Sequence, residues 1–221
     1  MHNALSTSSP HAAPLPAPRL VLGSTSPYRR ELLARLGLPF DVASPEVNER
    51  PLPDEAPLQT ALRLAAWKAR AVAQRCEDDA VVIGSDQVAD LNGMVLGKPG
   101  DHARAKAQLQ AMRGQTVRFH TAVCVKRAAT GFEQTEVSTV SVRFRALSDE
   151  AIDTYLRLEQ PYDCAGSAKC EGLGIVLLER IDSDDPTALV GLPLIVTTGL
   201  LQGAGLDVLG QLGRAGLPSQ T

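Results

Sequence analysis

The sequence predicts a mixed α/β fold, of the α+β kind, in which helices flank a twisted mixed sheet and two lobes enclose a central cleft. Two observations carry this prediction. Segments with helical periodicity alternate with short apolar runs that are typical of strands. Several of these runs are joined by hairpin signals such as Asn92–Gly93, and hairpins make neighbouring strands antiparallel, which excludes a purely parallel sheet.

The first ordered segment reads as a buried strand followed by a helix. The strand begins at Leu20 and ends in a turn rich in Gly, Ser and Thr. Ser26 is placed as the N-cap of the helix and Pro27 as its first residue, where the missing N–H of proline is not needed. Gly37 is placed to end this helix, because glycine readily adopts the conformation that closes a helix.

The next elements lead to a central strand. A short strand is expected near 39–43, and a long helical pattern runs over 56–75. The β-branched run 80–83 is continuously apolar, which is typical of a strand covered on both faces. A hairpin with its turn at Asn92–Gly93 is expected to follow.

The second half of the chain continues the alternation of helices and strands. Its two longest strands should be linked around 130–131, and Ser148 should cap the next helix, with a glutamate in the capping-box region. The expected elements are helix 101–112, strand 117–126, strand 134–144, a helix from Ser148 to the residue before Pro161, strand 174–179 and helix 193–204.

The composition indicates an ordinary soluble globular protein. The 221 residues are 44% hydrophobic and 21% charged. The formal net charge of −3 gives no general attraction to nucleic acid or to an anionic membrane, so neither is an expected partner. No apolar stretch approaches the roughly 20 residues that cross a bilayer, and a cytoplasmic location is expected. An anionic ligand would therefore be held by a local cluster of arginines and lysines.

The chain is predicted to form one domain with two tails. Residues 1–19 are rich in proline and alanine, lack the features of a signal peptide, and are expected to be a disordered tail. The domain is expected over 20–210, with a flexible tail over 211–221. The sequence does not determine the oligomeric state and is compatible with a homodimer.

The four cysteines lack the paired spacing of a zinc site. We interpret them as buried, reduced thiols in a reducing compartment. A disulfide between Cys164 and Cys170, which flank a segment that contains glycine, remains the alternative.

The segment GSTSPYRR is the first candidate site for an anion. It places Ser24 and the free backbone N–H groups of a helix start beside two arginines. A helix N-terminus attracts anions, and Arg29 could add a planar fork for phosphate oxygens. The alternative is a capped surface helix with solvated arginines. The spacing of a Walker A loop is absent.

Two further candidates lie in the central strand and its hairpin. Asp86 follows the apolar run directly, and a carboxylate at the end of a buried strand lies where ligands of open α/β sheets bind. It could hold a divalent metal or accept a proton, or it could cap a turn. Lys98, between Gly97 and Pro99, suits a point-charge contact to phosphate, although an exposed hairpin lysine is equally ordinary.

The last candidates lie in a glycine-containing segment and in an earlier loop. The segment YDCAGSAKCEGLGI carries Lys169 and Glu171 among small residues. Its glycines allow the backbone to approach a ligand closely, or simply form a tight turn. Glu49, in PEVNERP, is a carboxylate in an expected loop, for which a solvated charge is the default interpretation.

Five blocks in this order make the chain resemble the Maf family of nucleoside triphosphate pyrophosphatases, from about Leu20 to Gly210. The blocks are GSTSPYRR, PEVNERPLPDEAP, GSDQV with LGKP, YDCAGSAKCEGLGI and DPTALVGLPL. Within the family, the details resemble the branch that hydrolyses 7-methyl-GTP to 7-methyl-GMP and diphosphate in a house-cleaning role. The chain departs from the family at Asn48, where an aspartate is usual, and has Cys170 where serine is common.

The resemblance implies a role for each candidate residue. It implies that Asp86 is the proton acceptor, and that a divalent cation, Mg²⁺ or Mn²⁺, is held by Glu49 and Asp86. It implies that specificity for the base depends on Tyr28, Gln87 and Glu171. The residues expected on the phosphate side are Ser24, Arg29, Lys98 and Lys169.

The chemistry of these side chains suits the implied substrate. Guanine methylated at N7 carries a positive charge, and an aromatic face such as that of Tyr28 attracts a cation by roughly 0.5–2 kcal/mol. The Glu171 carboxylate could accept hydrogen bonds from guanine N–H groups, and the Gln87 amide can donate or accept.

Two rival functions remain. One is a house-cleaning pyrophosphatase for other non-standard nucleotides such as ITP, which a preference for ITP among several triphosphates would reveal. The other is a nucleotide-binding regulator of cell division without turnover. The clustering of acidic with basic residues favours catalysis, since a sensor needs only groups that bind.

Overall fold

The computed structural model describes residues 18–216 of the chain, so most of the predicted N-terminal tail and the last residues of the predicted C-terminal tail lie outside the described residues. A seven-stranded mixed sheet forms the centre of the molecule, which confirms the predicted mixed α/β class. Its strands are β1 (Arg19–Gly23), β2 (Asp41–Val42), β3 (Ala80–Leu91), β4 (Met94–Leu96), β5 (Thr116–Arg127), β6 (Phe132–Phe144) and β7 (Leu178–Asp182).

The sheet is parallel at one end and antiparallel at the other. The strand order is β2-β1-β3-β5-β6-β7, with β4 paired to β3. Strand β1 runs parallel to both β2 and β3, whereas the pairs from β3 onward are antiparallel. The short β1 stops at Gly23, opposite Gly84, while β3 continues along β5 to Asp90. Beyond Gly84, β3 therefore has no parallel strand beside it within the described part of the chain.

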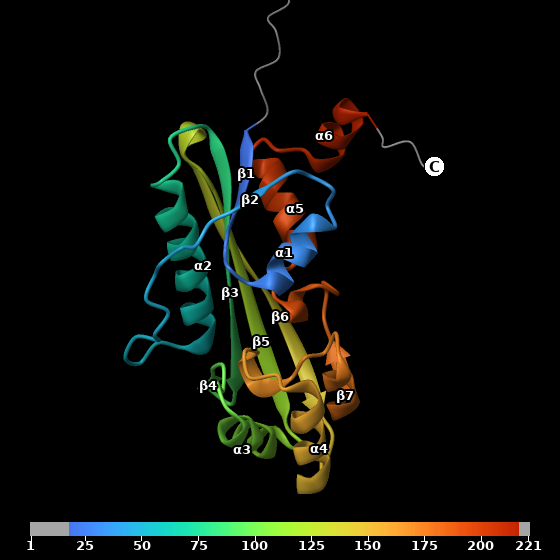
Figure 1. The fold of residues 1–221 in the computed structure, drawn as a ribbon. Coiled ribbons are helices and arrows are strands. Elements are labelled where there is room, and N and C mark those ends of the chain that lie inside the picture. Colours follow the sequence, from blue (N-terminus) through green and yellow to red (C-terminus); the bar gives the residue numbers. More distant parts are fainter. Residues whose placement is uncertain (1–17, 217–221) are drawn as a thin grey trace, which may run out of the picture.

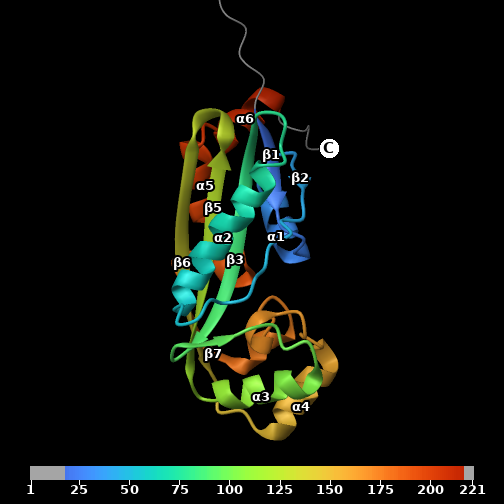
Figure 2. The ribbon, with the colours of Figure 1, turned by 90° about the vertical axis from the view of Figure 1, so that its left-hand side faces the viewer.

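Helices cover the sheet on both faces (Figures 1 and 2). Helix α2 packs on one face through a seam of alanines, and α1 and α5 pack on the other. Helices α3 and α4 lie together at the far end of the long strands. The helices are α1 (Pro27–Ala34), α2 (Pro57–Ala73), α3 (His102–Met112), α4 (Asp149–Glu159), α5 (Leu194–Gly203) and α6 (Val208–Ala215).

The molecule has two lobes, as the sequence predicts. The upper lobe in Figure 1 contains α1, α2, α5 and α6, and its core lies on both faces of the sheet. The lower lobe has a separate core between the sheet and the pair α3 and α4. Strands β3, β5 and β6 run through both lobes (Figures 1 and 2). Side chains on β3 are thereby held rigidly at the level where the lobes meet.

Local signals placed the helix starts and the tight turn correctly. The side chains of Ser26, Asp101 and Ser148 each accept a hydrogen bond from the backbone N–H three residues later, at α1, α3 and α4. Asn92 and Gly93 have φ values of 54° and 89°, the left-handed conformations that a two-residue hairpin turn requires. All four cysteines are free thiols.

Two predictions about the second half of the chain were wrong. The strand expected over 174–179 is a 3-10 helix, η3 (Leu173–Leu177), followed by β7. A Cβ at Gly174 would collide with the backbone of Lys169, so this glycine serves a tight turn and the strand starts later. The tail predicted over 211–221 contains most of helix α6, whose residues Val208 and Leu212 pack against the upper core.

Within residues 18–216, no helix combines the length and the apolar character that spanning a membrane requires.

Candidate active site

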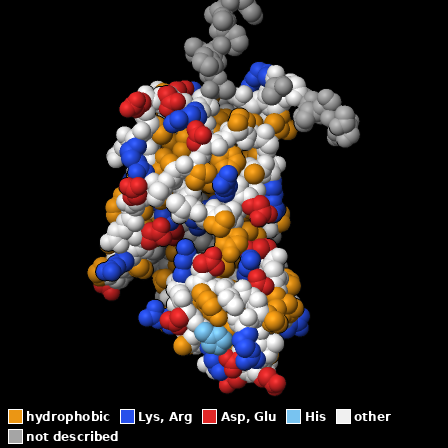
Figure 3. Space-filling model, in the orientation of Figure 1, with side chains coloured by type: hydrophobic (Ala, Val, Ile, Leu, Met, Phe, Trp, Pro, Cys, Tyr) orange, Lys and Arg blue, Asp and Glu red, His pale blue; other side chains and the backbone are white. Residues whose placement is uncertain are grey.

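A cavity of about 550 Å³ lies where the two lobes meet. Acidic and basic side chains gather side by side at this level of the surface (Figure 3). Of the nine residues that the sequence predicts for the site, all except Lys169 line this cavity. The eight that do are Ser24, Tyr28, Arg29, Glu49, Asp86, Gln87, Lys98 and Glu171.

Asp86 lies in the middle of β3, and the expectation that it follows the end of its strand was wrong. Strand β3 continues to Leu91 because it pairs with β5 over ten residues. The position is nevertheless open to a ligand, since the parallel neighbour β1 ends at Gly23, opposite Gly84. Asp86 thus lies just beyond the carboxyl end of β1, at the edge where open α/β sheets bind ligands.

Lys68 is a site residue that was not predicted from the sequence. It lies on α2, its side chain is only 4% exposed, and its Nζ donates to Asp86 Oδ1 at 2.6 Å and lies 2.8 Å from Glu49 Oε1. A signal was present in the sequence: Lys68 occupies the apolar face of α2, between Leu64 and Val72 at spacings of four residues. A lysine at such a position needs a charged partner.

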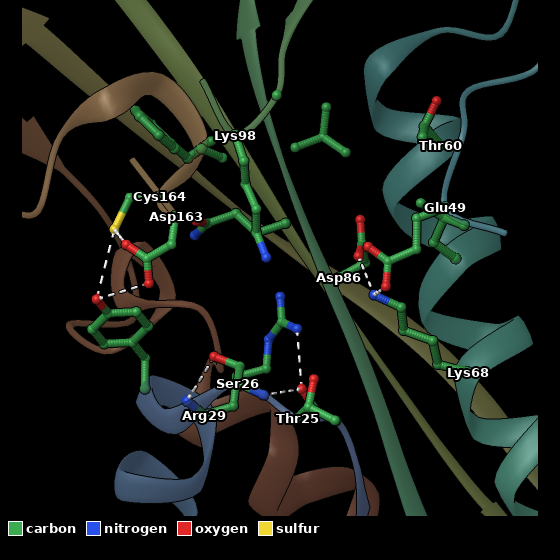
Figure 4. Close-up of a pocket in the computed structure, with 18 of the residues that line it drawn as sticks. Thr25, Ser26, Arg29, Glu49, Thr60, Lys68, Asp86, Lys98, Asp163 and Cys164 are labelled. Carbon is green, nitrogen blue, oxygen red and sulfur yellow. Dashed lines mark hydrogen bonds and ion pairs between the residues drawn. The ribbon is translucent and has the colours of Figure 1, made fainter. Parts of the chain in front are cut away.

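Glu49 reaches the cavity from the loop between β2 and α2. Burial opposes its ionisation, but the hydrogen bond and charge of Lys68, together with the charges of Lys98 and Arg29, outweigh that effect and lower the pKa of Glu49. The carboxylate is therefore ionised at neutral pH. Figure 4 shows Glu49, Asp86 and Lys68 together on one side of the cavity.

Ser24 and Arg29 lie at the turn from β1 into α1. Ser24 is buried, and its Oγ accepts from the Ser26 N–H at 3.2 Å and from Arg29 Nη1 at 3.4 Å. Arg29 Nε donates to the Gly191 carbonyl at 2.9 Å. Burial lowers the pKa of Arg29, and the charges of Asp86 and Glu49 oppose this effect. The guanidinium is thereby fixed with its end aimed into the cavity (Figure 4).

The block DPTALVGLPL acts as a scaffold behind the site. The buried Asp185 accepts from the Thr187 N–H, the Thr187 hydroxyl and the Ile195 N–H at 2.6–2.8 Å. These bonds tie the 3-10 segment η4 (Ala188–Val190) to the start of α5. They position the Gly191 carbonyl, which accepts from both Arg29 and Ser85.

Gln87 is held by the same scaffold. Its Nε2 donates to the carbonyls of Ala188 and Leu189 at 3.1 and 3.0 Å and lies 2.9 Å from Thr121 Oγ1. Two carbonyl acceptors fix the orientation of the amide, because an amide oxygen in that place would face two other oxygens. The amide group of Gln87 is therefore committed to the protein, and its Oε1 is the atom left to accept from a ligand.

The wall opposite Asp86 is formed by Tyr28 and the segment after α4. The Tyr28 hydroxyl donates to Asp163 Oδ2 at 3.4 Å and lies 3.8 Å from Cys164 Sγ. Burial and the neighbouring Cys164, Asp163 and Glu171 raise the pKa of Tyr28. Burial, with the charge of Asp163, likewise raises the pKa of Cys164 to about 11. Both groups are therefore protonated and uncharged at neutral pH.

The structure separates the two lysines that were predicted for the phosphate side. Lys98, just after β4, extends into the cavity (Figure 4) and has no ion-pair partner among residues 18–216. Lys169 Nζ instead lies 3.3 Å from Glu159 Oε1 and 5.7 Å from the centre of the Tyr28 ring. The structure does not bring Lys169 to the cavity wall.

The protein side chains alone do not build a metal cage. Among the described residues, no group of three or more His, Cys, Asp or Glu side chains is arranged to hold a metal ion. Asp86 and Glu49 do converge, with the Lys68 ammonium between them. Two carboxylates suit Mg²⁺ where substrate phosphates complete the coordination, so the donor set fits a cation that arrives with its ligand.

Comparison with known proteins identifies the family. The model of the Maf-like protein family matches residues 19–204. A 7-methyl-GTP pyrophosphatase of a Polaromonas species is 63% identical over 210 residues, which are 95% of each chain. One of Albidiferax ferrireducens is 62% identical and one of Cupriavidus metallidurans 58%, each over 87% of this chain and 96% of the relative.

One solved structure of another nucleotide pyrophosphatase is a weaker match. A nucleoside-triphosphatase, described as a dITP/XTP pyrophosphatase, of Mycobacterium abscessus has a TM-score of 0.42 and 20% identity. The alignment covers 88% of this chain and 97% of that chain. The assignment rests instead on the family model and on the relatives that are about 60% identical, and the chain is a member of the Maf family.

Proposed function

We propose that this protein hydrolyses the bond between the α- and β-phosphates of a nucleoside triphosphate, and that its substrate is 7-methyl-GTP. One observation carries the proposal: a single cavity holds the carboxylate pair of Asp86 and Glu49 opposite the cations Arg29 and Lys98. A triphosphate between them would meet cations along its chain and a carboxylate beside its α-phosphorus. The names of the relatives that are 58–63% identical support the same activity.

Asp86 is the proposed general base. Its Oδ1 is fixed by the Lys68 ammonium at 2.6 Å, and no hydrogen bond to its Oδ2 is found among residues 18–216. The free oxygen can take a proton from a water molecule that attacks phosphorus, a role that contributes typically 10²–10⁴-fold to a rate. Lys68 fixes the direction in which this oxygen faces.

Arg29, Lys98 and the start of α1 are the proposed triphosphate site. Arg29 is held by Ser24 and the Gly191 carbonyl, so its charge is positioned before the ligand arrives. Lys98 adds a second point charge. Phosphoryl transfer depends mainly on positioning and on electrostatic stabilisation of spreading charge, which fixed cations provide.

Glu49 and Asp86 are the proposed protein ligands of a divalent cation, Mg²⁺ or Mn²⁺. The lowered pKa of Glu49 keeps this ligand ionised. A bound cation would neutralise charge on the phosphate oxygens. Asn48 beside Glu49 supplies an amide in place of a carboxylate, and its Oδ1 accepts from the Arg50 N–H, which supports a structural role for Asn48 within the loop.

Tyr28, Gln87 and Glu171 are the proposed contacts of the base. The Tyr28 ring can stack on a cationic base, Gln87 Oε1 can accept from a base N–H group, and Glu171 can accept from two. The family resemblance implies that these three residues set specificity, and the orientation of the Gln87 amide supports a part as an acceptor for Gln87.

A substrate panel tests the proposal. Pyrophosphate release would be measured with 7-methyl-GTP, GTP, dTTP, UTP and ITP, each with Mg²⁺, with Mn²⁺ and with a chelator. We expect the highest kcat/KM for 7-methyl-GTP and no turnover with the chelator. A preference for ITP would contradict the substrate and favour the rival pyrophosphatase. Tight binding without release of pyrophosphate from any triphosphate would contradict the enzymatic function and favour a regulator.

A further inference from the structure

The charged side chains of the cavity form three groups (Figure 4). The cations Arg29 and Lys98 lie between Glu49 and Asp86 on one side and Asp163 on the other. Asp163 and Glu171 both line the cavity and are exposed. A phosphate chain would be repelled by these two carboxylates, so their wall must face the base of a nucleotide whose triphosphate lies between the cations and Asp86.

The charge of Asp163 is not balanced by its neighbours. Its carboxylate contacts the Tyr28 hydroxyl at 3.4 Å and the Cys164 thiol at 3.5 Å, both of which are uncharged at neutral pH. The nearby cation Lys169 lies 5.7 Å from the centre of the Tyr28 ring, but its charge is offset by Glu159, which is 3.3 Å from its Nζ. The base end of the cavity therefore carries the net negative charge of Asp163 and Glu171.

We propose that the charge of Asp163 is a determinant of substrate specificity, which selects a nucleobase that itself carries a positive charge over the neutral parent base. This inference rests on the proposed function and deepens it, since it names the property of 7-methylguanine that the protein recognises. A hydrogen-bonding site alone would accept guanine and 7-methylguanine about equally, because both present the same N1–H and N2–H₂ donors. Negative side chains beside the aromatic ring of Tyr28 would bind the cationic 7-methylguanine more tightly than the neutral guanine.

Asp163→Asn separates charge from structure. Asparagine keeps an oxygen that can accept from the Tyr28 hydroxyl, so the ring stays in place while the charge is removed. Asp184→Asn is the matched control, because Asp184 is also exposed and does not line the cavity. The kcat/KM for 7-methyl-GTP and for GTP would be measured at low and high salt, together with the dissociation constants of 7-methyl-GMP and GMP.

We expect Asp163→Asn to lower kcat/KM for 7-methyl-GTP by about 5- to 10-fold, the size of one interaction between charges near a protein surface. The kcat/KM for GTP should change less than about twofold. Added salt should lower the preference for 7-methyl-GTP over GTP more in the wild type than in the variant. If the ratio of kcat/KM for 7-methyl-GTP to kcat/KM for GTP is the same in the variant as in the wild type, the inference is wrong.

The binding measurement keeps this inference distinct from the proposed function. If the wild type releases no pyrophosphate yet binds 7-methyl-GMP more tightly than GMP, and Asp163→Asn removes that preference, the charge selection holds and the hydrolytic function fails. If the wild type hydrolyses 7-methyl-GTP with a preference that Asp163→Asn leaves intact, the function holds and the charge selection fails.

Discussion

Lys68 joins the two carboxylates of the site. Its ammonium lies within 2.8 Å of both Asp86 and Glu49 although its side chain is only 4% exposed. Removing a lysine from water is costly, and buried ion pairs add little net stability over a well-packed apolar side chain. The arrangement is therefore best explained by function: Lys68 holds two like charges close together and fixes the free oxygen of Asp86.

Replacement of Asp86 tests the proposed base. We expect Asp86→Asn to lower kcat by about 10²-fold or more, because an amide cannot take the proton from water. The free energy of unfolding should stay within about 1–2 kcal/mol of the wild-type value, because Lys68 keeps Glu49 as a charged partner. The measurements are steady-state pyrophosphate release and urea denaturation, with Asp184→Asn as the control. Near-native turnover would exclude Asp86 from the role.

Replacement of Lys68 should change both the rate and its pH dependence. We expect Lys68→Met to lower kcat/KM roughly 10- to 100-fold through loss of the positioned carboxylates. Lys68 helps to lower the pKa of Glu49, so in the variant this carboxyl should take up its proton at a higher pH. The acid limb of the pH profile should then move to higher pH.

The control for this variant is Lys126→Met, at the far end of β5. Lys126 is partly buried and, like Lys68, is paired with a carboxylate, Glu133 at 2.6 Å, but it does not line the cavity. A pH profile of Lys68→Met that coincides with that of the wild type would show that Lys68 does not set the protonation of Glu49.

At the residue scale, the sequence predicts well those site residues that share a short motif. Ser24 and Arg29 lie within one turn, so the local pattern was sufficient. Lys68 and Asp163 reach the site only because the fold brings α2 and the segment after α4 to opposite walls of one cavity. Lys169, close in sequence to Glu171, is drawn away by Glu159, a tertiary partner that spacing does not reveal.

At the element scale, the approach of α2 to β3 places Lys68 against Asp86. Gly84 allows this approach, since a Cβ there would collide with Ala65 O and Ala69 N of α2. We expect Gly84→Ala to destabilise the protein by about 3 kcal/mol or more, or to displace α2 and lower kcat/KM at least 10-fold. Thermal and urea denaturation with steady-state kinetics would measure both effects.

Gly199→Ala is the matched control for this substitution. Gly199 lies in α5, and a Cβ there would meet no atom within 4 Å. Alanine is favoured over glycine in helices by about 1 kcal/mol, so this variant should be slightly stabilised. A Gly84→Ala variant as stable and active as wild type would show that α2 does not need the close contact.

A salt bridge at the start of α2 fixes the loop that carries Glu49. Arg63 binds both oxygens of Glu55 at 2.5 and 2.7 Å, and its Nη2 donates to the Arg50 carbonyl at 3.3 Å. Glu55 also accepts from the Leu52 N–H and the Thr60 hydroxyl. The hydrogen bond from Arg63 lowers the pKa of Glu55 to about 2 against burial, which raises it.

The ion pair of Arg63 and Glu55 should make the stability of the protein depend on pH. Because the folded pKa of Glu55 is depressed, its contribution is present above about pH 4.5 and is lost as the pH falls toward 2. We expect Glu55→Gln to lower the free energy of unfolding by up to about 3 kcal/mol at pH 7 and by almost nothing near pH 2. Urea denaturation of the wild type and the variant between pH 7 and pH 2 would measure this difference in the free energy of unfolding. Glu77→Gln, at an exposed position, should change stability by less than about 0.5 kcal/mol.

Elements were predicted where local chemistry decides them and missed where packing does. The capped helices and the Asn92–Gly93 turn depend on side chains within a few residues. Helix α6 contains Gly210 and Gly213, which disfavour a helix, yet Val208 and Leu212 pack on the upper core and stabilise it. The length of β3 could not be read from its own residues, because its pairing with β5 carries it past the apolar run.

At the scale of the whole molecule, the net charge of −3 hides a strong local separation of charge. The two lobes share long strands, so the cavity between them has a fixed frame, and charged groups from distant segments face each other within it (Figures 1 and 4). The weakly acidic surface gives a triphosphate no general attraction. Binding of the triphosphate must then depend on the few cations inside the cavity.

That dependence predicts the response to salt. Raising the salt concentration from about 0.1 M to about 1 M shortens the screening length from about 10 Å to about 3 Å. At a fixed concentration of divalent cation, KM for the triphosphate should rise several-fold while kcat changes less, since the buried pair of Lys68 and Asp86 is screened little. Lys98→Gln should raise KM at low salt and flatten the dependence, whereas Lys126→Gln should leave both unchanged. A KM that does not respond to salt in the wild type or in Lys98→Gln would contradict this prediction. It would mean that neutral hydrogen bonds hold the triphosphate, and that the charged groups of the cavity act on the base rather than on the phosphates.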